Sequence, residues 1–105
     1  KLPAFKKLMQ QTQLAYKQGQ WNQAEAAALQ AQRLAPQSAE TFLYLALVAN
    51  KKNKPANAEA LAQRGLSYAQ SNAMKKQLWL VILKAAQQQK DQKTILQAQK
   101  ALKAL

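Results

Sequence analysis

An internal repeat of 34 residues is the feature that most constrains the fold of this 105-residue chain. The segment 21–36, WNQAEAAALQAQRLAP, moved by 34 positions lies on 55–70, PANAEALAQRGLSYAQ, and Ala24 then meets Ala58. Upstream, the same step places Leu8 on Phe42, Thr12 on Ala46, Ala15 on Ala49 and Gly19 on Asn53. A helical period of 34 is typical of stacked helical hairpins, and such arrays bind other proteins.

The residue types in the chain argue against catalysis. There is no cysteine and no histidine, which removes disulfides, thiol chemistry, Cys/His metal sites and histidine general-base catalysis. The four acids, Glu25, Glu40, Glu59 and Asp91, are scattered along the chain and form no evident carboxylate pair. We therefore expect no enzyme activity, no cofactor and no metal.

The net charge of +12 comes almost entirely from lysine, because Arg33 and Arg64 are the only arginines. Specific phosphate recognition usually favours arginine, whose fork binds two oxygens at once. Single-strand binders also interleave aromatic side chains with arginine, a pattern missing here. We expect no specific nucleic-acid partner, whereas attraction to an acidic partner or an anionic surface stays open. The lysine clusters are Lys6–Lys7, Lys51–Lys52–Lys54, Lys75–Lys76 and Lys90–Lys93.

Helical spacing of the apolar residues predicts an all-α fold of six helices. The expected ranges are 3–18, 21–35, 39–52, 55–70, 73–88 and 91–103. The segment 41–50, TFLYLALVAN, is apolar nearly all round, which predicts a central buried helix. Gln87–Gln89 is expected to form a polar loop. No stretch approaches the ~18 apolar residues of a membrane span.

Individual residues mark the expected helix ends. Ser38 is a predicted N-cap, Ser71 and Asn72 both offer a cap for the fifth helix, and Gly19 and Asn53 are expected to adopt left-handed turns. Gly65 lies inside a predicted helix, where glycine costs roughly 1 kcal/mol relative to alanine. Since the small Ala31 occupies the matching position of the first unit, we expect close helix packing at both places.

The third unit departs from the strict period. A step of 34 fails there, whereas a step of 36 gives matching residue types. The matched pairs are Phe42 with Leu78, Ala49 with Ala85, Ala58 with Thr94 and Gly65 with Ala101. The chain is thus predicted to be one domain of three units, 3–36, 38–70 and 72–105, of which the third is divergent and carries two inserted residues.

These units resemble tetratricopeptide repeats. The residues that carry the resemblance are Trp21, Ala24, Ala31 and Pro36 in the first unit and Ala46, Ala58 and Gly65 in the second. Departures are Thr12 in place of Gly or Ala, Gln11 in place of Leu and Gln70 in place of Pro. The resemblance implies three stacked hairpins that form a short right-handed solenoid.

The resemblance also implies a concave groove, lined by the first helix of each unit, for a protein or peptide partner. Its predicted residues are Met9, Gln13, Tyr16, Leu43, Leu47, Asn50, Lys51, Lys76, Trp79 and Leu83, flanked by Lys6, Lys17, Glu40 and Gln87. The apolar members are either an open strip for a partner, with Trp79 and Tyr16 as anchors, or a sealed core. The carboxylate clamp of chaperone adaptors is rejected, because only Lys76 agrees with it.

The Ala-, Gln- and Lys-rich composition is similar to that of short periplasmic repeat domains of Gram-negative bacteria. Among them, the chain resembles outer-membrane lipoproteins that activate a bifunctional penicillin-binding protein in peptidoglycan synthesis. This resemblance implies a peptidoglycan synthase as partner and a place at the periplasmic face of the outer membrane. Membrane attachment is then expected only through a lipid anchor upstream of residue 1.

Two other functions stay open at this point. One is a pilus or secretion-system assembly factor, and the other is a cationic domain that binds an anionic polymer or membrane surface. The oligomeric state is open as well, because the last predicted helix carries an apolar stripe formed by Ile95, Ala98, Leu102 and Leu105.

Overall fold

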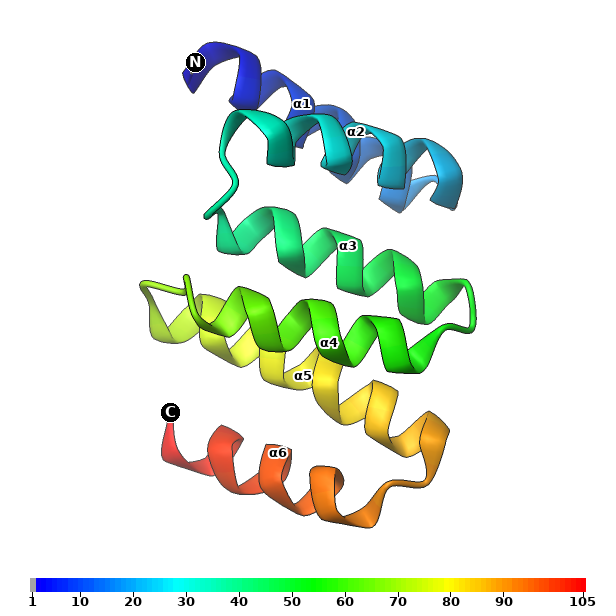
Figure 1. Cartoon of the computed structure of the whole chain (residues 1–105), viewed down its shortest axis with the longest axis vertical. Coiled ribbons are helices and arrows are strands. Elements are labelled where there is room, and N and C mark those ends of the chain that lie inside the picture. Colours follow the sequence, from blue (N-terminus) through cyan, green and yellow to red (C-terminus); the bar gives the residue numbers. More distant parts are fainter. Residues whose placement is uncertain (1) are drawn as a thin grey trace.

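The computed structural model describes residues 2–105, in which six helices and no strands are found. The helices are α1 (Leu2–Lys17), α2 (Trp21–Leu34), α3 (Ala39–Lys51), α4 (Pro55–Leu66), α5 (Asn72–Gln89) and α6 (Gln92–Ala104). Figure 1 shows them following one another along the long axis of the molecule, with the two termini at opposite ends. The predicted all-α fold of helical hairpins is confirmed.

Side-chain caps begin three of these helices. The hydroxyls of Ser38 and Ser71 accept a hydrogen bond from the backbone N–H three residues later, at 3.4 and 3.1 Å. Asp91 caps α6 in the same way at 3.3 Å, and its second oxygen accepts the hydroxyl of Thr94 at 2.7 Å. Each such cap stabilises a helix by about 1 kcal/mol, and both predicted serine caps are present.

The two helices of each hairpin are joined by the same turn. Gly19, Asn53 and Lys90 are left-handed, with φ of 73°, 60° and 56°. In each turn the next N–H donates at 2.9 Å to a carbonyl five residues earlier, at Ala15, Ala49 and Ala86 respectively. The first two turns were predicted from the residue type, whereas lysine has no preference for this conformation and gave no signal.

Two expected boundaries are wrong. Gln87–Gln89 form the last turn of α5 rather than a loop, and the amide of Gln89 donates to Glu59 at 3.3 Å. The fourth helix ends at Leu66, four residues before its predicted end. There the N–H of Tyr68 bonds the carbonyl only three residues earlier, and its ring stacks on Phe42 at a centroid distance of 5.8 Å. Tertiary packing therefore ends this helix early.

The central position of α3 explains its composition. This helix contacts α1, α2, α4 and α5. Its buried residues are Thr41, Phe42, Leu43, Leu45, Ala46, Val48, Ala49 and Asn50. A helix with neighbours on most sides needs apolar residues on most sides, so the predicted central buried helix is confirmed.

Close packing at Gly65 fixes the distance of α4 from its neighbours. A Cβ at this position would lie 2.9 Å from Cδ2 of Leu78 and 3.0 Å from Cβ of Phe42. Ordinary carbon contacts begin near 3.4 Å, so α4 could not approach this closely with any larger residue. The expected close packing is confirmed.

Burial in the third hairpin follows the step of 36 residues. Thr94 and Ala98 of α6 are buried like Ala58 and Ala62 of α4. On the preceding helices, Leu78 of α5 is fully buried in the same way as Phe42 of α3. The same step therefore holds in both helices of this hairpin.

Candidate partner-binding site

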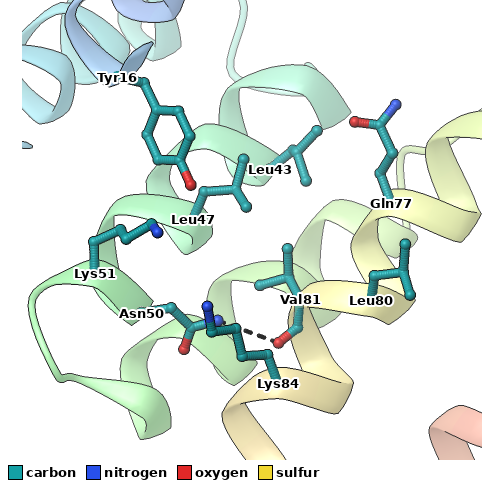
Figure 2. A pocket seen from close by; sticks show the side chains of 9 residues that line it. All are labelled: Tyr16, Leu43, Leu47, Asn50, Lys51, Gln77, Leu80, Val81 and Lys84. Atoms are coloured by element: carbon teal, nitrogen blue, oxygen red, sulfur yellow. Dashed lines mark hydrogen bonds between the residues drawn. The ribbon is translucent and has the colours of Figure 1, made fainter. Parts of the chain in front are cut away.

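A pocket opens between α3 and α5, with Tyr16 of α1 at its edge (Figure 2). Its volume is about 270 Å³. The residues that line it are Tyr16, Leu43, Leu47, Asn50, Lys51, Gln77, Leu80, Val81 and Lys84. Small-molecule sites usually span ~300–1,000 Å³, so this volume suits one or two side chains of a partner better than a cofactor.

The walls of the pocket are apolar. Leu43 and Val81 are buried members of the main core cluster, and the half-buried Leu47 packs against that cluster. Leu80 is different because 46% of it is exposed, which is high for a leucine beside a pocket. The core therefore continues to the surface here, and an apolar side chain of a partner could extend it.

Asn50 ties the two helices together at one end of the pocket. It is only 6% exposed, and its amide Nδ2 donates to the carbonyl of Val81 at 3.3 Å (Figure 2). Because a carbonyl oxygen can only accept a hydrogen bond, the NH₂ group of the amide must face Val81, and Oδ1 must point away from it. The buried Oδ1 then has no hydrogen-bond partner among the described residues. A buried acceptor without a donor costs about 1–3 kcal/mol. A hydrogen-bond donor supplied to Oδ1 would remove this cost.

The polar rim of the pocket is cationic. Lys51 and Lys84 are exposed and come from the two helices that form the pocket. No acid stands among the described residues that line it. The Nζ of Lys51 lies 5.7 Å from the ring centroid of Trp21, a cation–π distance that keeps this ammonium near the rim.

The aromatic edge of the pocket stays uncharged. The ring of Tyr16 meets Tyr44 edge-on at 5.8 Å and Trp21 at 5.3 Å. Burial, and then the nearby Tyr44, raises the pKa of Tyr16 above its usual 10.0. Burial, and then Glu40, raises the pKa of Tyr44 in the same way. Both phenols therefore keep their protons at neutral pH and can donate hydrogen bonds.

Other kinds of site were sought in residues 2–105. There, no three His, Cys, Asp or Glu side chains lie close enough together to hold a metal ion. Over the same residues, no helix combines the length and the apolar character needed to cross a membrane. The candidate site is the pocket between α3 and α5, because it pairs apolar walls with two exposed lysines.

Comparison with known proteins places this fold. No protein-family profile matches the chain, and no curated protein sequence matches it. Among solved structures, the globular C-terminal domain of LpoP from P. aeruginosa is similar, with 33% sequence identity and a TM-score of 0.84. The match covers 92% of this chain and 93% of that one. The chain belongs to the LpoP C-terminal domain family.

In this LpoP-family domain, half of the predicted groove residues meet at one place. The five that line the pocket are Tyr16, Leu43, Leu47, Asn50 and Lys51. Leu43 is a core residue, only 3% exposed, and that exposed part lies in the wall of the pocket. The family resemblance therefore located the α3 side of the pocket.

Three predicted residues lie elsewhere. Met9 is only 3% exposed, and its sulfur accepts the hydroxyl of Thr41 at 3.8 Å, so α3 seals it into the core. Gln13 donates to Glu40 at 2.9 Å, away from the pocket. Lys76 is exposed but does not line the pocket.

Trp79 and Leu83 are not brought into the pocket either. Both are half-buried and pack against the core cluster. Residues two apart on a helix differ by ~200° around its axis, so both point almost opposite to Val81, which faces α3. By the step of 36 they match Leu43 and Leu47, which line the pocket toward α5, the first helix of the next hairpin. Trp79 and Leu83 accordingly lie on the edge of α5 that points away from α3.

Sequence reasoning missed the α5 side of the pocket, which consists of Gln77, Leu80, Val81 and Lys84. It assumed that equivalent edges of successive helices line the groove. A pocket between two neighbouring first helices instead combines the edge of one helix that points to the next hairpin with the edge of the other that points back to the preceding hairpin. This rule, applied to the step of 36, could have found these residues.

Proposed function

We propose that this chain is a non-enzymatic protein-binding domain that binds a cell-envelope enzyme and activates or scaffolds it. The partner we favour is a bifunctional penicillin-binding protein. The observation that carries the proposal is the 33% identity to the LpoP domain, which extends over nearly the whole of both chains. The resemblance of the sequence to periplasmic lipoproteins that activate such synthases agrees with it.

We further propose that the hairpins are tetratricopeptide repeats that form a right-handed solenoid. The small residues at the helix crossings support this assignment, since Ala24, Ala58 and Gly65 are all buried. A lipid anchor upstream of residue 1 would hold the domain at the periplasmic face of the outer membrane. From there a tethered domain can reach a synthase in the inner membrane.

The surface proposed to bind the partner is the pocket between α3 and α5. It combines apolar walls with exposed polar groups at the rim, the arrangement typical of protein interfaces. Leu80 is its most exposed apolar member, at 46%, because the other apolar lining residues are buried or half-buried. It is therefore the position at which a substitution tests binding with the least risk to the fold.

The test uses the purified domain and the bifunctional penicillin-binding protein of the same cell. We expect binding in the micromolar range or tighter, together with faster glycan polymerisation or cross-linking when the domain is added. Leu80→Gln should weaken binding roughly tenfold, because burial of a leucine side chain contributes about 1.5–3 kcal/mol.

Leu96→Gln is the matched control, since Leu96 is a helical leucine 57% exposed on α6, outside the pocket. It should bind like the unchanged domain. Equal weakening by both substitutions would refute the pocket as the binding surface. An unchanged domain that neither binds the synthase nor alters its rate would refute the proposed function.

A further inference from the structure

We propose that the pocket between α3 and α5 recognises an acidic–apolar segment of its protein partner. In such a segment, a bulky apolar side chain enters the pocket and a neighbouring carboxylate meets Lys51 and Lys84. The inference rests on the proposed function only in assuming that this face binds a protein. It adds the chemical class of the segment that is bound.

The apolar half of the preference follows from the walls. Leu43 and Val81 belong to the core cluster, Leu47 packs against it, and these residues reach the pocket from two different helices. A volume of about 270 Å³ is enough to hold several waters in the free domain. Water in contact with these walls gains little from them, so its displacement by an apolar side chain is favourable.

The acidic half follows from the charges. Lys51 and Lys84 make no salt bridge within residues 2–105, where the ion pair found joins Lys52 to Glu25 at 3.1 Å. Figure 2 shows both lysines at the same end of the pocket as Asn50, with Gln77 at the other end. Two lysines without an acidic partner in residues 2–105, beside an apolar cleft that no acid lines, favour a ligand with a carboxylate next to its apolar side chain.

The unpaired Oδ1 of Asn50 lies at this cationic end. An extended peptide carries a backbone N–H at every residue other than proline, and such a donor would satisfy this acceptor. Oδ1 is shielded from water in the free domain, so a neighbouring side chain must move when the segment binds.

A protein segment fits these features better than two other occupants. A second copy of this chain would bring another net charge of +12 and the same two lysines to the pocket. A nucleic acid would leave the apolar walls unpaired and would find no arginine in the lining. Both occupants are distinguished by the experiment below.

The experiment measures the binding of three end-blocked eight-residue peptides to the 105-residue domain by NMR titration at 0.1 M salt. The first has a leucine flanked by glutamates, the second has glutamine in place of each glutamate, and the third has alanine in place of the leucine. We expect amide shifts centred on α3 and α5 with the first peptide. Binding of the glutamine peptide should be about three- to tenfold weaker, the range expected for losing exposed ion pairs. Binding of the alanine peptide should be at least about tenfold weaker, because burial of a leucine side chain contributes about 1.5–3 kcal/mol.

Matched charge variants test the role of the lysines. The pair Lys51→Gln and Lys84→Gln should lower affinity for the acidic peptide three- to tenfold and leave affinity for the glutamine peptide unchanged. The control pair Lys100→Gln and Lys103→Gln removes the same charge from exposed positions on α6. It should change either affinity less than twofold. Equal losses from both pairs would overturn the inference in favour of unspecific charge attraction.

The remaining outcomes separate this inference from the proposed function. If the acidic peptide binds no tighter than the glutamine peptide, the inference fails even if the domain binds the penicillin-binding protein. If the peptides behave as expected and the synthase does not bind, the proposed function fails and the pocket chemistry stands. Tighter binding of a polyuridylate probe than of the acidic peptide, or dimerisation through α3 and α5, would also overturn the inference.

Discussion

Replacement of Gly65 by alanine tests whether close packing or helix propensity governs α4. An ordinary Gly→Ala change inside a helix stabilises it by about 1 kcal/mol. Here the new Cβ would lie 3.0 Å from Cβ of Phe42, an atom fixed to the backbone of α3. It would also lie 2.9 Å from a methyl group of Leu78, which is fully buried and has little room to turn.

The two effects have opposite signs. Contacts this short require a shift of several tenths of an ångström between α4 and α3, and overpacking of this kind costs typically about 1–3 kcal/mol. After the gain of about 1 kcal/mol in helix propensity, we expect a net destabilisation of about 0–2 kcal/mol. For a domain of this size, 1 kcal/mol lowers the Tm by roughly 4–8 °C.

The assay is thermal and urea unfolding followed by circular dichroism. Ala60→Gly, at an exposed position of the same helix, calibrates the local propensity and should cost about 1 kcal/mol. The double variant Gly65→Ala with Leu78→Ala removes the methyl contacts and should lose less than the sum of the two single changes. A stabilised Gly65→Ala variant would show that the packing argument is wrong.

Three further predictions concern turns and caps. Lys90→Gly should stabilise the domain by up to about 1 kcal/mol in urea unfolding, because φ is 56° there. Ser71→Ala should cost about 1 kcal/mol by the same measure, because it removes the cap of α5. In the folded state the pKa of Asp91 lies below its ordinary value of 3.8, and the main cause is the hydrogen bond from the Thr94 hydroxyl. This carboxylate therefore stabilises the fold above the unfolded pKa, and the stabilisation is lost as pH falls through the lower folded pKa. Melting curves at pH 7 and about pH 3 should show a smaller acid-induced loss in Asp91→Asn than in the unchanged chain.

Features that depend on local chemistry were predictable from the sequence. Ser38 and Ser71 cap helices as expected, because a hydroxyl beside free N–H groups acts whatever surrounds it. Gly19 and Asn53 turn as expected because both residues tolerate positive φ. The end of α4 was not predictable, because it depends on the stacking of Tyr68 on a ring from another helix.

The candidate site was predictable in part. Leu43, Leu47, Asn50 and Lys51 were found because they lie on the edge of α3 that the repeat pattern assigns to the groove. Their counterparts across the pocket were missed. The rotation of α5 relative to α3 decides which α5 residues line the pocket. Matching residues between repeats does not give this rotation.

The sequence by itself determined the all-α class and the hairpins through its apolar periodicity and its 34-residue repeat, and the central place of α3 through the nearly all-apolar segment 41–50. These patterns act through each helix separately. The tertiary structure decided where the surface opens. It turned Trp79 and Leu83 away from α3 and placed Leu80 and Lys84 in the lining of the pocket. A pocket between two helices depends on their mutual rotation and spacing, and close contacts such as that of Gly65 with Leu78 set these only in the folded molecule.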